Sequence, residues 1–145
     1  MRLMLVLAAF LLAAGCASVP MAPADEDAAG KRFEPPPATQ AVLYVFRESA
    51  FGGAVSMPVT VGPQPLGDLA TDTWFRVVLE PGSYEVRCNM ENSASVPVQL
   101  ASGETRFVEA AIRFGFVAPR CALTEVDAAT ARIAILSGRR AQETR

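Results

Sequence analysis

AVLYVFR, residues 41–47, is the most informative stretch of this 145-residue chain for predicting the fold. β-Branched and aromatic residues favour strands, and successive residues of a strand point to opposite faces of the sheet. All residues of the stretch except the last are apolar, so both faces of such a strand would be apolar. A strand of this kind is covered on both sides. We therefore predict that residues 41–47 form a central, buried strand.

Seven further segments after residue 47 have the composition of short strands, and residues that favour turns separate them. Alternation of apolar and polar residues is clearest between Tyr84 and Met90. The number and spacing of the segments predict an all-β fold, a small antiparallel β-sandwich of about seven to eight strands. The expected strands are residues 57–61, a short segment around Leu66 and Leu69, and residues 74–79, 84–90, 95–100, 105–116 and 121–126.

Two local motifs refine this scheme. Pro81 and Gly82 suit a type II turn, which needs a fixed φ followed by a positive one, and they predict a hairpin between the flanking strands. RFGFV, residues 113–117, resembles the aromatic strand of an RNA-recognition domain. It lacks the glycine after the basic residue, however, and no partner aromatic strand accompanies it. We interpret it as a buried aromatic strand with Phe114 pointing inward.

A short helix is expected after the last strand. Asp127 can cap its first turn, and Gly138 ends it after residues 128–137. Ile133 and Leu136 would dock this helix on a sheet.

The first residues have the features of an export signal. Arg2 precedes an apolar run over residues 3–14, which is too short for a membrane span of about 20 residues. The small residues before Cys16 resemble the bacterial lipobox. This resemblance implies that residues 1–15 are a lipoprotein signal peptide and that Cys16 becomes the acylated first residue.

The predicted location follows from this anchor. A lipoprotein amino terminus carries more than one acyl chain, so membrane attachment through Cys16 would be stable. Ala17 is not the aspartate that, by the same resemblance, retains lipoproteins at the inner membrane. We therefore expect the protein at the outer membrane, on its periplasmic face. The alternatives are an ordinary cleaved signal with an incidental cysteine, and an uncleaved anchor.

The rest of the chain divides by composition. Residues 16–39 are rich in proline and alanine, contain an acidic cluster at residues 25–27, and show no hydrophobic period. We interpret them as an extended tether behind the acylated Cys16. Residues 40–138 form the β-sandwich domain, and residues 139–145 are a polar, frayed tail.

Charge argues against nucleic acid as a partner. Only Arg2 of the 13 basic residues lies in the signal peptide, so 12 basic and 15 acidic residues remain after cleavage. Nucleic-acid binding depends on cations that neutralise phosphates. A mildly acidic, exported chain is not suited to this role.

Several segments together resemble a known group of proteins. AVLYVFR, VTVGPQPLGDL, LEPGSYEV and LASGETRFVEA occur in this order behind the lipobox, within residues 38–136. This order resembles an uncharacterised family of bacterial lipoproteins with a domain of unknown function, and is similar to small PEGA-type surface modules in strand and turn order. The resemblance implies a β-sandwich in the cell envelope, and it supplies no activity or site. Gly62-Pro63 departs from the usual Asp-Gly or Asn-Gly turn of such modules.

Cys88 and Cys121 form an even pair in a compartment where disulfides persist, which favours a bridge between them. The alternative is two buried thiols that pack as small apolar groups. The chain contains no histidine to join them in a metal site, so we expect neither a metal nor a cofactor.

The absence of histidine also bears on catalysis. It excludes a Ser-His-Asp or Cys-His arrangement. Carboxylate pairs remain, such as Asp68 with Asp72 and Glu80 with Glu85, but they flank predicted turns where solvated carboxylates are common. We therefore predict that the protein is not an enzyme, and a histidine-free hydrolase is the least favoured alternative.

The favoured function is a non-catalytic interaction or structural module. In the glycine-containing loop of residues 48–56, Phe51, Gly52 and Gly53 are the candidate contact with another envelope protein. Alternatively, Phe51 folds back on the core. A second function, a periplasmic carrier of a small ligand or lipid, would need an open cavity inside the sandwich.

Overall fold

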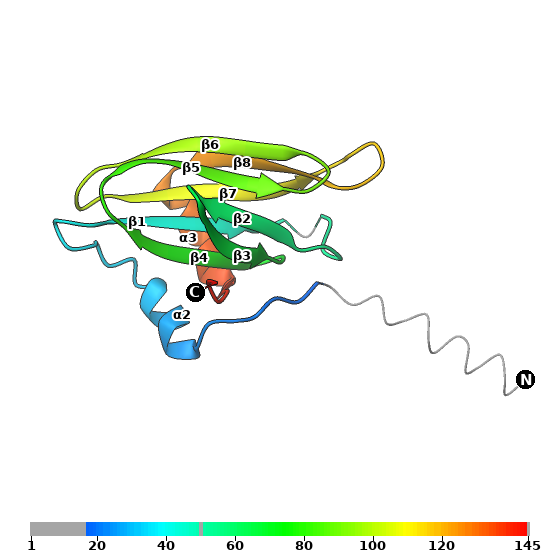
Figure 1. Ribbon diagram of the computed structural model, residues 1–145. Coiled ribbons are helices and arrows are strands. Elements are labelled where there is room, and N and C mark those ends of the chain that lie inside the picture. The colour runs from blue at the N-terminus through cyan, green and yellow to red at the C-terminus, as the bar shows by residue number, and fades with distance from the viewer. Residues whose placement is uncertain (1–16, 50, 145) are drawn as a thin grey trace, which may run out of the picture.

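Two β-sheets pack face to face, and helices cover the outer side of one of them (Figure 1). This computed structural model describes residues 17–49 and 51–144, so the predicted signal peptide and Cys16 lie outside the described residues. The first sheet has the order β8-β7-β1-β4-β9 and the second β3-β2-β5-β6. The elements are α2 (Ala24–Gly30), β1 (Ala41–Arg47), β2 (Met57–Val61), β3 (Gln64–Leu69), β4 (Thr73–Leu79), β5 (Gly82–Asn89), β6 (Ser93–Leu100), β7 (Thr105–Arg113), β8 (Arg120–Val126), α3 (Ala128–Ser137) and β9 (Arg139–Arg140).

The predicted small all-β sandwich is confirmed, with one difference in strand direction. β1 pairs with β7 in parallel, and β4 pairs with β9 in parallel, whereas the other pairings are antiparallel. The first sheet is therefore mixed. Parallel neighbours require long connections, and most of the sandwich lies between β1 and β7 along the chain.

β1 is buried along its whole length, as predicted. Ala41, Leu43 and Val45 belong to the core between the two sheets. Tyr44 and Phe46, on the other face, belong to a second core beneath the helices. The two apolar faces of this strand thus match two separate apolar layers.

A disulfide joins the two sheets. Cys88 lies on β5 and Cys121 on β8, and their sulfur atoms are 2.09 Å apart, with a Cα–Cα distance of 6.3 Å. The prediction that these two cysteines pair is confirmed. The bridge therefore links one sheet to an edge strand of the other.

The predicted hairpin at Pro81-Gly82 is wrong. β4 pairs with β1 and β9, whereas β5 pairs with β2 and β6, so the connection crosses from one sheet to the other. Gly82 has no positive φ and is already paired with Leu100. Turn residues indicate where a chain changes direction, but hydrogen bonding and burial elsewhere decide which strands become partners.

The C-terminal helix has the predicted bounds but faces the other way. Asp127 caps α3 by accepting a hydrogen bond from the Thr130 amide at 2.9 Å. Its buried face consists of Ala131, Ala134 and Ile135. The prediction that Ile133 and Leu136 dock it is wrong, because these side chains are exposed. Two alanines allow the helix to approach the sheet closely, and larger residues at those positions would not.

The segment expected to be a tether is folded from residue 17 onward. Residues 24–30 form α2, where acidic residues in the first turn favour the helix. The Asp27 carboxylate accepts a hydrogen bond from the Arg140 amide at 2.6 Å, and Tyr44 Oη donates one to the Gly30 carbonyl at 2.8 Å. Phe33 packs against Tyr44 and Phe107. The prediction of an extended tether is therefore wrong for these residues, because a few specific contacts outweigh their polar composition.

The tail is likewise not frayed over residues 139–144. β9 extends the first sheet beside β4. Ala141 is fully buried and donates its amide to the Trp74 carbonyl at 2.8 Å. The Thr144 amide bonds the Leu66 carbonyl at 2.7 Å. Backbone groups at the edge of β4 need partners, and the polar tail supplies them.

Gly30→Val tests whether α2 is docked. A side chain on Gly30 would run into the buried Trp74 ring, so we expect the free energy of unfolding to fall by about 1–3 kcal/mol. Ala28→Val, at an exposed position of the same helix, is the matched control, and its helix-propensity cost is under about 1 kcal/mol. Urea unfolding of both variants gives the comparison. Equal losses would show that α2 does not pack on Trp74.

Replacing both Cys88 and Cys121 with alanine tests the bridge. We expect a loss of about 3–4 kcal/mol in the free energy of unfolding, since the cross-link restricts the unfolded chain. Reduction should destabilise the wild-type protein but not the double variant. Mass analysis after alkylation of the native protein checks the pairing directly, and two alkylated thiols at these positions would contradict it.

Candidate functional site at one end of the sandwich

Three segments that are distant in sequence meet at one end of the sandwich. They are Ala17, residues 48–49 and 51–56 of the loop between β1 and β2, and the loop of residues 114–119, and we call this region the loop end. The Ala17 amide donates a hydrogen bond to the Gly53 carbonyl at 2.8 Å. The rings of Phe51 and Phe114 lie 4.6 Å apart between centroids. The residue that follows Cys16 therefore lies beside the candidate contact loop.

Arg47, the last residue of β1, organises the loop of residues 48–56. It is only 1% exposed, and its guanidinium donates hydrogen bonds to four backbone carbonyls. The acceptors are Val55 at 2.8 Å, Gly52 at 2.9 Å, Leu69 at 3.3 Å and Phe51 at 3.4 Å. Burial lowers the pKa of Arg47 from its usual value. The Arg47 side chain thus holds the backbone of this loop in one conformation.

Hydrogen bonds from Arg47 hold the predicted contact residues Phe51 and Gly52 in place. Gly52 has a φ of +72°, and a Cβ atom there would lie 2.7 Å from the Ile112 side chain. This close approach explains why the position is glycine. Phe51 is 43% exposed and rests on Phe114 rather than in the core. Phe51, Gly52 and Gly53 therefore lie on a structured loop.

The RFGFV motif is not a buried strand. β7 ends at Arg113, and the following residues connect it to β8. Phe114 is 85% exposed, Phe116 101% and Val117 91%. The interpretation of this motif as a buried aromatic strand is wrong, because it extends beyond the last Arg113–Arg120 pair, where no second layer covers it.

Glu91 binds the backbone of the exposed loop of residues 114–119. Its carboxylate accepts backbone hydrogen bonds from Phe116 at 3.4 Å, Val117 at 3.1 Å and Ala118 at 2.5 Å. The amides of Ala118 and Val117 lower the pKa of Glu91, and Arg120 adds a smaller effect in the same direction. Glu91 is therefore ionised at neutral pH and fixes the shape of the loop.

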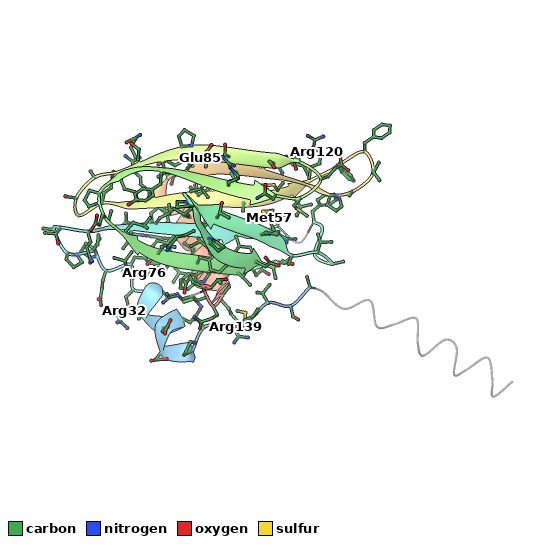
Figure 2. The ribbon with its side chains drawn as sticks, viewed as in Figure 1. Arg32, Met57, Arg76, Glu85, Arg120 and Arg139 are labelled. Atoms are coloured by element: carbon green, nitrogen blue, oxygen red, sulfur yellow. A yellow bond between two sulfur atoms is a disulfide. The ribbon has the colours of Figure 1, made fainter. Side chains whose placement is uncertain are left out.

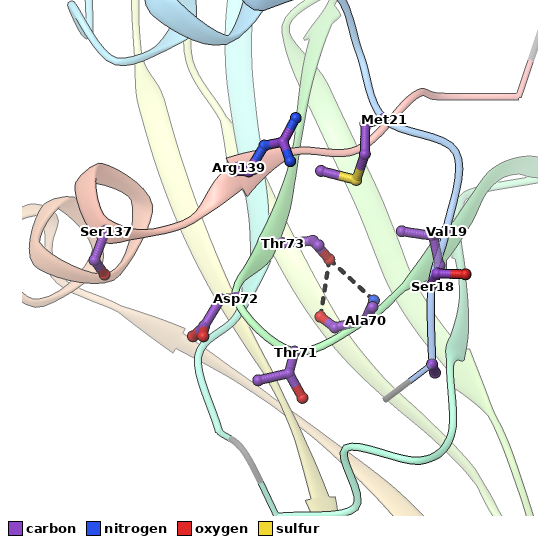
Figure 3. A pocket seen from close by; sticks show the side chains of 10 residues that line it. Ser18, Val19, Met21, Ala70, Thr71, Asp72, Thr73, Ser137 and Arg139 are labelled. Carbon is purple, nitrogen blue, oxygen red and sulfur yellow. Dashed lines mark hydrogen bonds between the residues drawn. The ribbon is translucent and has the colours of Figure 1, made fainter. Parts of the chain in front are cut away.

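A surface hollow of about 360 Å³ lies beside the loop end, between the N-terminal segment and the β3–β4 connection (Figure 3). The Thr73 hydroxyl, which faces it, donates to the Ala70 carbonyl at 2.8 Å and accepts from the Ala70 amide at 3.0 Å. The Thr71 hydroxyl donates to the Ser49 carbonyl at 3.3 Å. These hydroxyls stabilise local turns through their bonds to the backbone, and Asp72 lines the same hollow.

Two of the four carboxylates considered for acid–base chemistry, Asp68 and Glu85, have side-chain partners. Asp68 accepts a hydrogen bond from the Ser56 hydroxyl at 2.9 Å. Hydrogen bonds from Ser95 and Arg87 lower the pKa of Glu85, which does not suit a general acid at neutral pH. Within residues 17–49 and 51–144, no three acidic or cysteine side chains gather closely enough to bind a metal ion.

Sequence reasoning missed Arg47, Glu91 and the exposed state of residues 114–117. One signal was available for Arg47, since a cation that ends an apolar strand before a glycine-containing loop can bind loop carbonyls. No local signal pointed to Glu91, because its contacts are 25 to 27 residues away in sequence.

Comparison with known proteins gives one distant relative and no function. No protein-family model matches the chain. An uncharacterised protein of Haemophilus influenzae (strain ATCC 51907 / DSM 11121 / KW20 / Rd) is 29% identical over 106 residues. The match covers 72% of this chain and 63% of that protein. Both helices in the described part of the chain fall short of the length and apolar character needed to cross a membrane.

Arg47→Met tests whether the buried guanidinium organises the loop end. The substitution leaves buried carbonyls without donors, so we expect a loss of about 2–4 kcal/mol in the free energy of unfolding and faster amide exchange at residues 51–55. Arg87→Met is the control, because Arg87 forms an exposed ion pair with Glu85 worth about 0–1 kcal/mol. Similar effects of both changes would show that Arg47 has no special role.

Proposed function

We propose that this protein is a lipid-anchored, non-catalytic interaction or structural module of the bacterial cell envelope, attached through acylated Cys16. The observation that carries the proposal is the coincidence of Arg2, a short apolar run and small residues directly before Cys16. Outer-membrane location, on the periplasmic face, follows from the residue at position 17 and is part of the same proposal.

The folded N-terminal segment makes the proposal more specific. Ala17 is covalently bonded to Cys16 and hydrogen-bonded to Gly53 of the loop end. Residues 24–33 pack on the domain rather than extend away from it. An anchor at Cys16 would thus hold the domain close to the bilayer, instead of at the end of a long tether.

The absence of catalysis is supported by the chemistry of the described side chains. The chain has no histidine, the Thr71 and Thr73 hydroxyls at the surface hollow bond to nearby backbone, and Glu85 has a lowered pKa. A carrier function receives no support from the sandwich interior. Core residues fill the space between the two sheets, and Leu43, Val59 and Val108 are each at most 1% exposed there.

The proposal also includes the family to which the chain belongs. We propose that the chain belongs with uncharacterised lipoproteins whose strand and turn order is similar to PEGA-type modules. The two-sheet architecture and the uncharacterised relative from Haemophilus influenzae are compatible with this assignment. Neither supplies an activity that could be carried over.

Substitution of Cys16 tests the anchor. We expect Cys16→Ala to move the protein from the membrane to the soluble periplasmic fraction, because the acylated sulfur is lost. The intact mass of the wild-type protein should show loss of residues 1–15 and the added mass of acyl chains. Ser18→Ala is the matched control and should stay in the membrane fraction. A wild-type mass without acyl groups, or unchanged membrane attachment of a cleaved Cys16→Ala chain, would overturn the proposal.

A further inference from the structure

We propose that the loop end is a membrane-docking surface, at which Phe51, Phe114, Phe116 and Val117 insert into the interfacial layer of the bilayer. This inference rests on the proposed lipid anchor at Cys16 and adds a second attachment point. The occupant of the surface is the phospholipid leaflet that holds the acyl chains.

The first support is the concentration of exposed apolar groups. Seven large apolar side chains are exposed in the described part of the chain, and four of them are at the loop end: Phe51, Phe114, Phe116 and Val117. The Phe116 side chain is entirely exposed. A clustered apolar patch on a protein surface marks an interaction site more often than scattered single residues do.

The shape of this surface favours a bilayer. The loop between β7 and β8 projects beyond both sheets as a narrow tip (Figure 1). Apolar side chains with aromatic rings are typical of protein segments that lie in the membrane interface. A protruding tip can enter a fluid lipid layer without a complementary pocket, whereas a protein partner would have to provide one.

The tip is also rigidly supported. The Glu91 carboxylate accepts hydrogen bonds from three consecutive loop amides. Asn92 exchanges two hydrogen bonds with the backbone of Cys121, at 2.8 and 2.9 Å, and Cys121 is disulfide-bonded to Cys88. A loop that is already ordered loses little conformational entropy when it inserts. The exposed aromatic side chains therefore lie on an ordered loop and not on a flexible segment.

Two cationic side chains lie at the base of the tip. Arg113 and Arg120 face each other as the last pair between β7 and β8. Both are exposed, and Figure 2 shows Arg120 beside the projecting loop. The Glu91 carboxylate nearby accepts hydrogen bonds from loop amides, and its Oε1 lies 3.8 Å from Nη1 of Arg120. Guanidinium groups next to an inserted apolar tip are suited to bind lipid phosphates.

The position of the anchor selects the bilayer as the occupant. Ala17 bonds to Gly53, two residues from Phe51, and the Phe51 ring packs on Phe114. Acyl chains on the preceding residue would therefore enter the membrane from the same end of the sandwich. The opposite end, which includes Ser102 in the β6–β7 connection, would face away from the bilayer.

Fluorescence quenching by lipid tests this orientation. Acylated Phe116→Trp protein is reconstituted in vesicles of phosphatidylethanolamine and phosphatidylglycerol, with either ordinary or brominated acyl chains. We expect the emission added by the new tryptophan to shift to shorter wavelength and to fall about twofold or more with brominated lipid. Trp74, which is 1% exposed, gives a background common to all variants. Exposed Ser102→Trp at the opposite end is the control and should not be quenched.

The outcomes separate this inference from the proposed function. Intact mass measured before reconstitution reports acylation by itself, and a chain without acyl groups would overturn both proposals. An acylated Phe116→Trp chain quenched no more than Ser102→Trp would overturn membrane docking alone. A Phe116→Trp chain whose emission is blue-shifted in native membranes, but not quenched by brominated lipid in the vesicles, would overturn it in favour of a protein partner.

Discussion

Burial of β1 on both faces is the constraint on which the rest of this structure depends. One face, with Leu43 and Val45, needs a second sheet, and the other, with Tyr44 and Phe46, needs a separate cover. The second sheet is supplied by β3, β2, β5 and β6. The cover consists of α3, α2 and the residues around Phe33. Because a single strand must satisfy two apolar layers, residues 17–33 and 139–144 pack onto the domain.

The same strand connects the core to the loop end. β1 finishes at a buried arginine, whose charge must be satisfied where no carboxylate lies within ion-pair distance in the described part of the chain. Backbone carbonyls of the loop of residues 48–56 serve instead. That loop supports Phe51, receives the hydrogen bond from Ala17 and contacts Phe114. The exposed apolar surface thus rests on a rigid base that begins in the core.

Local signals succeeded where a single segment determined the outcome and failed where partners had to be chosen. Strand β1 and the bounds of α3 were predictable, since both depend on residues adjacent in sequence. The partner of β4 was not, because the turn at Pro81-Gly82 is compatible with a hairpin or with a crossing between sheets. The aromatic RFGFV motif was misassigned for a related reason. Apolar composition shows that a segment can be buried, but not whether anything lies above it.

The amino-acid pattern was enough to predict the β class of the domain, the double-sided burial of β1, the cap of α3 and the pairing of Cys88 with Cys121 as the favoured option. It also contains the signals that predict export and lipidation. Two features became visible only in the folded domain: residues 17–39 and 139–144 dock on it, and Ala17, Phe51 and Phe116 share one end. The physical reason is that these contacts join residues tens of positions apart. Their energy depends on surfaces that exist only after the sheets have formed.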